Sequence, residues 1–218
     1  MQYKIGVDVY STEGRKIGMV DRVVIEPDTK EVTHLVVKKG VFFSQDKVIP
    51  TSSVASTTQT HVFLNEEAAN LDQFPEYEVT QYVPAEEYQP PTIDSTDISP
   101  GALYAYPSVD SWLVNRRSGY ANPRYVLRSQ TNIPEDAVAL DHGAKVYSND
   151  GKYIGNVERI FTHPKDEIAT HLLISEGLFL KEKKLIPTQW IKETYEDEVH
   201  LKVDSLLIAN LPVYQPKV

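Results

Sequence analysis

A gapless internal repeat constrains the fold of this chain more than any other feature of its sequence. Residues 9–77 align with residues 146–214 at a constant offset of 137, and 23 of the 69 aligned positions are identical. The longest shared segments begin at Val9 and Val146, and the tripeptide Thr-His-Leu recurs at 33–35 and 170–172. Because chance does not produce a gapless match of this length, the chain contains two copies of one small domain.

The identical positions are mainly turn residues, prolines and apolar residues, which determine a fold rather than a reaction. The structural positions shared by the copies include Gly14, Gly18, His34 and Pro50, with Gly151, Gly155, His171 and Pro187 as their equivalents. We expect Gly14 and Gly18 to be turn glycines, since an acidic residue followed by Gly suits a tight hairpin. Pro50 follows an apolar run, and proline is tolerated where a strand ends.

Each copy shows the pattern of short strands joined by turns. Runs of β-branched and apolar residues predict strands at 17–25, 32–38, 46–49 and 60–64 in the first copy. Residues 65–70 predict a single helical turn capped by Asn65. Five or six short strands in about 70 residues suggest a small closed barrel, since closure removes exposed edges. The predicted class is therefore all-β, with two small barrels in tandem.

The repeat also predicts the domain organisation. We assign the first copy to residues 1–77, a linker to 78–133 and the second copy to 134–218. The linker is rich in proline, which interrupts long elements, and in tyrosine, so parts of it are expected to pack on the domains. We expect the two barrels to pack together, either within one chain or across a homodimer.

Composition limits the classes of partner and compartment. The net charge is −9 and the sequence pI is near 5.2, which argues against broad nucleic-acid binding and adsorption to anionic lipid. The absence of cysteine excludes disulfides and thiolate chemistry, and suits a reducing compartment. The N-terminal residues lack a signal-peptide pattern and no apolar run is long enough to span a membrane. We therefore expect a soluble, cytoplasmic protein.

These motifs resemble a known family. Val-Tyr-Ser-x-(Asp/Glu)-Gly-x-x-Ile-Gly, then Thr-His-Leu, then Ile-Pro, is similar to the PRC-barrel domain of the photosynthetic reaction centre H subunit and of a bacterial ribosome maturation factor. The resemblance covers both copies. It implies a non-enzymatic protein-binding or scaffold module, as in stand-alone tandem PRC-barrel proteins of bacteria, some linked to stress responses. Two alternatives are a ribosome- or RNA-associated factor and a peripheral subunit of a photosynthetic or other membrane complex.

One basic and aromatic patch in the linker is a candidate interaction site. It consists of Trp112, Arg116, Arg117, Tyr120 and Arg124. Such a mixture can bind RNA through phosphate contacts and stacking. On an acidic chain we favour a linker that is solvated, or that docks on the acidic barrels and buries Trp112.

The remaining candidates have simple structural explanations. His34 and His171 occupy equivalent positions, but a metal site needs three or four ligands, so we expect half-buried rings with one nitrogen hydrogen-bonded. Glu193, Glu196, Asp197 and Glu198 form an acidic cluster that could bind calcium weakly, although we favour a solvated loop. No nucleophile elbow or phosphate-binding glycine loop is present. The sequence predicts no enzyme activity, no metal and no cofactor.

Overall fold

The computed structural model describes residues 1–39, 45–68, 70–84, 125–163, 165–176 and 182–215. By its internal contacts the chain divides into two units, Met1–Glu78 with Thr131–Val218, and Val79–Gln130. The first unit therefore contains both copies of the repeat. Among the described residues, every helix is too short and too polar to span a bilayer.

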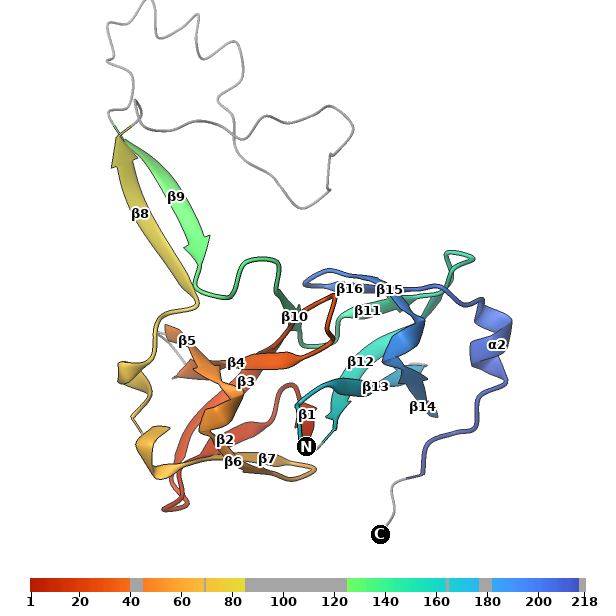
Figure 1. Cartoon of the computed structure of the whole chain (residues 1–218), viewed down its shortest axis with the longest axis horizontal. Coiled ribbons are helices and arrows are strands. Elements are labelled where there is room, and N and C mark those ends of the chain that lie inside the picture. The colour runs from red at the N-terminus through yellow and green to blue at the C-terminus, as the bar shows by residue number, and fades with distance from the viewer. Residues whose placement is uncertain (40–44, 69, 85–124, 164, 177–181, 216–218) are drawn as a thin grey trace, which may run out of the picture. The chain divides into compact units, whose positions relative to one another are not determined.

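The first copy forms a sheet with the strand order β5-β4-β3-β2-β7-β6 (Figure 1). Its strands are β2 (Asp8–Tyr10), β3 (Lys16–Ile25), β4 (Val32–Lys39), β5 (Gln45–Pro50), β6 (Val54–Thr57) and β7 (His61–Leu64). Neighbours along this path are antiparallel except β2 and β7, which are parallel. The two ends of the path, β5 and β6, follow one another in the chain through the 3₁₀ turn η1 (Thr51–Ser53). All four predicted strands of this copy are confirmed.

The second copy repeats this path as β14-β13-β12-β11-β16-β15. Its strands are β11 (Lys145–Tyr147), β12 (Tyr153–Thr162), β13 (Ala169–Glu176), β14 (Glu182–Pro187), β15 (Ile191–Thr194) and β16 (Glu198–Leu201). The short helices of the two copies are η2 (Glu66–Ala68), η3 (Leu71–Gln73), η4 (Thr188–Trp190) and α2 (Ser205–Ala209). In η2 the Asn65 side chain accepts a hydrogen bond from the Ala68 amide at 3.0 Å, so the predicted cap is confirmed. The predicted all-β class, with two equivalent units in tandem, is also confirmed.

The predicted role of the repeated glycines is confirmed at one position and wrong at the other. Gly14 and Gly151 have φ values of 78° and 73°, as a tight turn requires. Gly18 is not in a turn but within β3. A Cβ atom on Gly18 would lie 2.6 Å from Cγ1 of Val37 and 2.8 Å from the Lys38 carbonyl oxygen. Glycine is therefore needed at position 18 because β4 approaches closely.

Two further strands are exchanged between the copies. β1 (Gln2–Lys4), at the start of the first copy, pairs with β12 of the second copy. β10 (Val138–Asp141), at the start of the second copy, pairs with β3 of the first copy. The registers match, because Tyr3 faces Ile160 and its equivalent Leu140 faces Val23. Each copy therefore completes its sheet with the first strand of the other.

A short antiparallel contact joins the copies at a second place. The Val32 amide donates to the Glu167 carbonyl oxygen at 3.1 Å, and the Ala169 amide donates to the Lys30 carbonyl oxygen at 2.8 Å. These two hydrogen bonds are equivalent under the repeat offset, and they flank a bridge between Glu31 and Ile168. One continuous apolar core contains buried side chains of both copies. The two copies thus form one hydrophobic body rather than two separate cores.

The exchanged strand β1 carries a buried polar contact into the second copy. The Tyr3 side chain is fully buried, and its hydroxyl donates to Oε2 of Glu167 at 3.0 Å. Oγ1 of Thr162 donates to the same carboxylate oxygen at 2.9 Å. Burial and the neighbouring Glu167 carboxylate raise the pKa of Tyr3. The phenol therefore remains a neutral hydrogen-bond donor at physiological pH.

Part of the predicted linker forms a two-stranded sheet. β8 (Glu78–Pro84) pairs with β9 (Tyr125–Thr131), and the hydroxyls of Thr80 and Ser129 lie 3.2 Å apart. The linker therefore leaves and re-enters the repeat region through a pair of adjacent strands.

Candidate functional site

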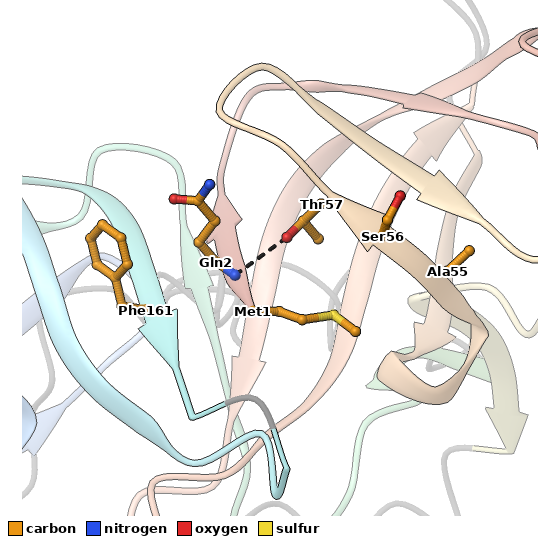
Figure 2. Close-up of a pocket in the computed structure, with 6 residues that line it drawn as sticks. All are labelled: Met1, Gln2, Ala55, Ser56, Thr57 and Phe161. Atoms are coloured by element: carbon orange, nitrogen blue, oxygen red, sulfur yellow. Dashed lines mark hydrogen bonds between the residues drawn. The ribbon is translucent and has the colours of Figure 1, made fainter. Parts of the chain in front are cut away.

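A pocket of about 450 Å³ lies where the exchanged strand β1 meets β6 and β12. Its lining consists of Met1, Gln2, Ala55, Ser56, Thr57 and Phe161 (Figure 2). The Gln2 amide donates to Oγ1 of Thr57 at 3.3 Å and so connects β1 to the end of β6. The pocket exists only because β1 of the first copy lies against β12 of the second.

β6 is the edge strand beside this pocket. It ends the path of the first sheet and pairs only with β7 among the described strands. A bulge lies at Ala55, between the pairs Val54 with Leu64 and Ser56 with Phe63. Ala55 and Ser56 are exposed, small and uncharged. An edge of this kind presents unpaired backbone groups without the charged side chains that usually block strand addition.

The equivalent edge of the second copy is charged. β15 carries Lys192 and Glu193 at the positions of Ala55 and Ser56, with the same bulge. The Lys192 ammonium lies 3.2 Å from Oε1 of Glu193, and the Tyr195 hydroxyl donates to Oε2 of Glu193 at 3.1 Å. The hydrogen bonds from Lys192 and Tyr195 lower the pKa of Glu193, which keeps this edge charged. The two edge strands therefore have the same backbone arrangement, but only β15 carries charged side chains that hinder the addition of another strand.

Arg159 contacts two of the residues that line this pocket, Gln2 and Phe161. Its Nη1 donates to Oε1 of Gln2 at 2.8 Å and its Nη2 donates to the Gln59 carbonyl oxygen at 3.2 Å. The guanidinium also lies over the Phe161 ring, 5.9 Å from the centroid. With only 9% of Arg159 exposed, these contacts fix β1, the turn before β7 and the aromatic wall relative to one another.

Arg22 of the first copy is the equivalent of Arg159, and it contacts the second copy at the position that corresponds to Gln59. Its Nη1 donates to Oε2 of Glu196 at 3.3 Å, and its guanidinium lies 5.3 Å from the Tyr77 ring centroid. The Tyr77 hydroxyl donates to Oε1 of Glu196 at 3.5 Å. Burial, followed by the Glu196 carboxylate, raises the pKa of Tyr77 to about 12.

The contacts of Glu196 change the interpretation of the acidic cluster. The sequence favours a solvated loop over Glu193, Glu196, Asp197 and Glu198, but Glu196 binds Arg22 and Tyr77 of the first copy. Glu198 lies 3.0 Å from Nε2 of His200. Within the described residues, no three acidic, histidine or cysteine side chains are grouped to hold a metal ion.

The two repeated histidines are structural residues on β4 and β13. His34 lies opposite Pro50 and His171 opposite Pro187, so the strand positions repeat. Both rings are half-buried. Nδ1 of His34 is buried without a hydrogen-bond partner, and burial lowers the pKa of this imidazole. The expected hydrogen bond is therefore absent at that nitrogen of His34.

The candidate patch in the linker lies outside the described residues. This applies to Trp112, Arg116, Arg117, Tyr120 and Arg124. The pocket beside β6 and the two arginines were not predicted from the sequence. One signal was available, because Arg22 and Arg159 are identical in the repeat and each directly precedes apolar residues of a strand.

Comparison with known protein families gives a match in both copies. A family model described as the PRC-barrel domain matches residues 5–66 and 142–211. These two ranges begin directly after β1 and β10, so the exchanged strands precede the matched regions. No curated protein matches the chain.

Proposed function

Because the chain belongs to the PRC-barrel family, we propose that it is a non-enzymatic protein-binding module that holds an extended partner segment along β6. The family occurs in diverse proteins and is generally non-catalytic, which supports a binding role. The observation that carries the proposal is the uncharged edge of β6 beside a pocket. We further propose a cytoplasmic location, which agrees with a chain that contains no cysteine.

The partner segment adds to the sheet as one more strand. Its main chain pairs with the backbone groups on the side of β6 that faces away from β7, as in other complexes formed by strand addition. Thr57 contributes less to partner binding, because its hydroxyl already accepts a hydrogen bond from the Gln2 amide. The contact is short, so the complex is expected to be weak and reversible.

The pocket supplies side-chain preference. Alternate side chains of an added strand point to one face, so one partner side chain enters the pocket whose lining includes Met1 and Phe161. The Met1 thioether and the Phe161 ring favour an apolar side chain, since methionine adapts its shape to different ligands. Arg159 keeps the pocket open by holding Gln2 and Phe161 in place.

A displayed library of random short peptides, selected on the full chain, tests the proposal. Selected peptides should bind with shifts of the β6 amide resonances, and their sequences should alternate apolar and polar residues. Ser56→Lys introduces the charged protection found on other edge strands, and should weaken binding by about tenfold or more.

The equivalent edge provides the matched control. Glu193→Lys changes the aligned position on β15 and should leave peptide affinity unchanged. Thermal unfolding of both variants verifies that each remains folded. Peptides that bind Ser56→Lys as tightly as the natural protein would overturn the proposal.

A further inference from the structure

A second cavity, of about 660 Å³, lies at the other end of the exchanged strand β1, beside Lys4 and Ile5. Its polar lining consists of Lys4, His142, Tyr153, Asn156, Glu158, Ser175 and Lys183. Ile5 and Val157 lie at its base and are almost fully buried. A volume of this size is within the range of sites for small molecules.

Of the two lysines of this cavity, one is paired with a carboxylate and the other is not. Lys4 forms no ion pair with any residue that the structure describes. Nζ of Lys183 lies 2.5 Å from Oε2 of Glu158, but an ammonium has three donors, so two remain for a ligand. The two lysines and one glutamate therefore leave a net positive charge on a chain whose total charge is −9.

Uncharged donors lie in the same cavity. Ser175 is buried, and its hydroxyl makes no hydrogen bond with another described residue. The His142 ring lies against the backbone of Gly6, where a Cβ atom would be 2.8 Å from its Cδ2. The Tyr153 side chain is 52% exposed and can cover a flat ligand from the solvent side.

The equivalents of the two lysines have the opposite charge in the first copy. Asp141 aligns with Lys4, and Asp46 aligns with Lys183. Asp21 aligns with Glu158, whereas Lys16 and Lys38 align with Tyr153 and Ser175. Burial and the Asp21 carboxylate raise the pKa of Asp46, and the neighbouring Lys38 and Arg22 oppose that rise. The equivalent positions of the first copy therefore carry three carboxylates and two lysines, whereas the cavity at Lys4 has two lysines and one carboxylate and is the better site for an anion.

We propose that this cavity binds a small organic anion, a carboxylate or a phosphate ester, whose charged group contacts Lys4 and Lys183 and whose flat apolar body lies against the exposed Tyr153 ring. Ser175 donates a further hydrogen bond to the charged group. Recognition of this kind is independent of the β6 edge, so the cavity adds a small-molecule site to a protein-binding module.

Benzoate and phenyl phosphate serve as probes, since they share an apolar ring and differ in the charged group. Titrated into the isotopically labelled full chain, they should shift the amide resonances of Lys4, Gly143 and Ser175 at millimolar concentrations. The tighter probe identifies the charged group that the cavity prefers. Resonances around Asp46, the equivalent of Lys183, should not move.

Variants that change the charge of the cavity test whether Lys4 and Lys183 bind the anion. Lys4→Asp installs the residue found at the equivalent position and should weaken binding about tenfold or more. Lys183→Met keeps the aliphatic stem, removes the ammonium and should have a similar effect. Lys16→Asp has the same change in charge on the first copy, at the Tyr153 position, and should have little effect. No resonance shift with either probe, or equal binding by the Lys4→Asp and Lys16→Asp variants, would overturn the proposal.

Discussion

The two copies cross over at equivalent strands in the same register, yet they stabilise the crossing by different chemistry. Arg159 is nearly buried and donates to uncharged oxygens of Gln2 and Gln59. Arg22 is more exposed and binds the carboxylate of Glu196, which aligns with Gln59. The copies also differ in charge at their edge strands, where β6 is uncharged and β15 is charged, and at the cavity beside β1 and its equivalent in the first copy. The backbone is thus retained in both copies, whereas the side chains around the crossing have diverged into a neutral edge, a charged edge and a basic cavity.

This contrast indicates that the exposed side chains around the exchanged strands can change while the fold is retained. A strand exchange depends mostly on backbone hydrogen bonds and buried apolar side chains, so it tolerates substitution on the exposed faces of the strands. The half-buried residues of β1, Gln2 and Lys4, each line one of the two proposed sites. One exchanged strand therefore contributes to both the proposed protein-binding surface and the proposed small-molecule site.

The largest expected effect comes from truncating the buried residue of an exchanged strand. Tyr3→Ala should lower the free energy of unfolding by about 3 to 5 kcal/mol, and Leu140→Ala, its equivalent, by about 2 to 5 kcal/mol. Because the core is shared, each variant should destabilise both copies together. Urea unfolding should show one transition, followed by circular dichroism and by Trp190 fluorescence in a Trp112→Phe background.

Tyr3→Phe is the control for that experiment. It retains the ring and removes only the hydroxyl that donates to Glu167, so the loss should be smaller, about 1 to 3 kcal/mol. Two separate unfolding transitions in either alanine variant would contradict a shared core.

The intermediate effect concerns the two arginines. Arg159→Gln should cost about 1.5 to 3 kcal/mol, because the hydrogen bonds from a nearly buried charged donor to Gln2 and Gln59 would be lost. Arg22→Gln should cost about 1 kcal/mol or less, since its Glu196 partner is 58% exposed. Raising the salt concentration should diminish the Arg22 contribution and leave that of Arg159 nearly unchanged, as chemical denaturation can measure. Equal losses with equal salt dependence would remove the proposed difference between the two crossings.

The strands within each repeat were predictable from the sequence, and the exchange was not. Turn residues such as Gly14 and β-branched runs such as 17–25 are local signals, so they located the strands. β1 and β10 share no identical residue at equivalent positions and lie before the repeated region. Their pairing joins residues more than 100 positions apart, which no local pattern encodes. The pocket beside β6 was missed for the same reason, because half of its lining depends on that pairing.

The smallest expected effect concerns a pair that did not diverge. His34 and His171 are identical, and burial lowers the pKa of His34 from its ordinary value of 6.5. Because His34 binds a proton less readily in the folded chain than in the unfolded chain, protonation favours the unfolded chain as the pH falls. Stability should therefore decline slightly as the pH falls from about 6.5 toward the folded pKa of His34.

Titration of the imidazole resonances by nuclear magnetic resonance measures this directly, with the urea-unfolded chain as the reference. The midpoint of His34 should lie below that reference. His34→Gln should remove part of the stability loss on the acid side. A folded midpoint at or above the reference would show that the half-buried ring is not desolvated.

The reciprocal exchange also affects how the protein is made. β1 leaves the ribosome first, but its partner strand, which includes Arg159, is synthesised more than 150 residues later. At about 5 to 20 residues per second, the first strand waits roughly 8 to 30 seconds for its neighbour. β3 likewise has an unpaired edge until Val138–Asp141 has emerged. The first copy therefore cannot finish folding during its own synthesis, whereas β12 emerges when β1 is already made, so the nascent first copy has open sheet edges of the kind that chaperones shield.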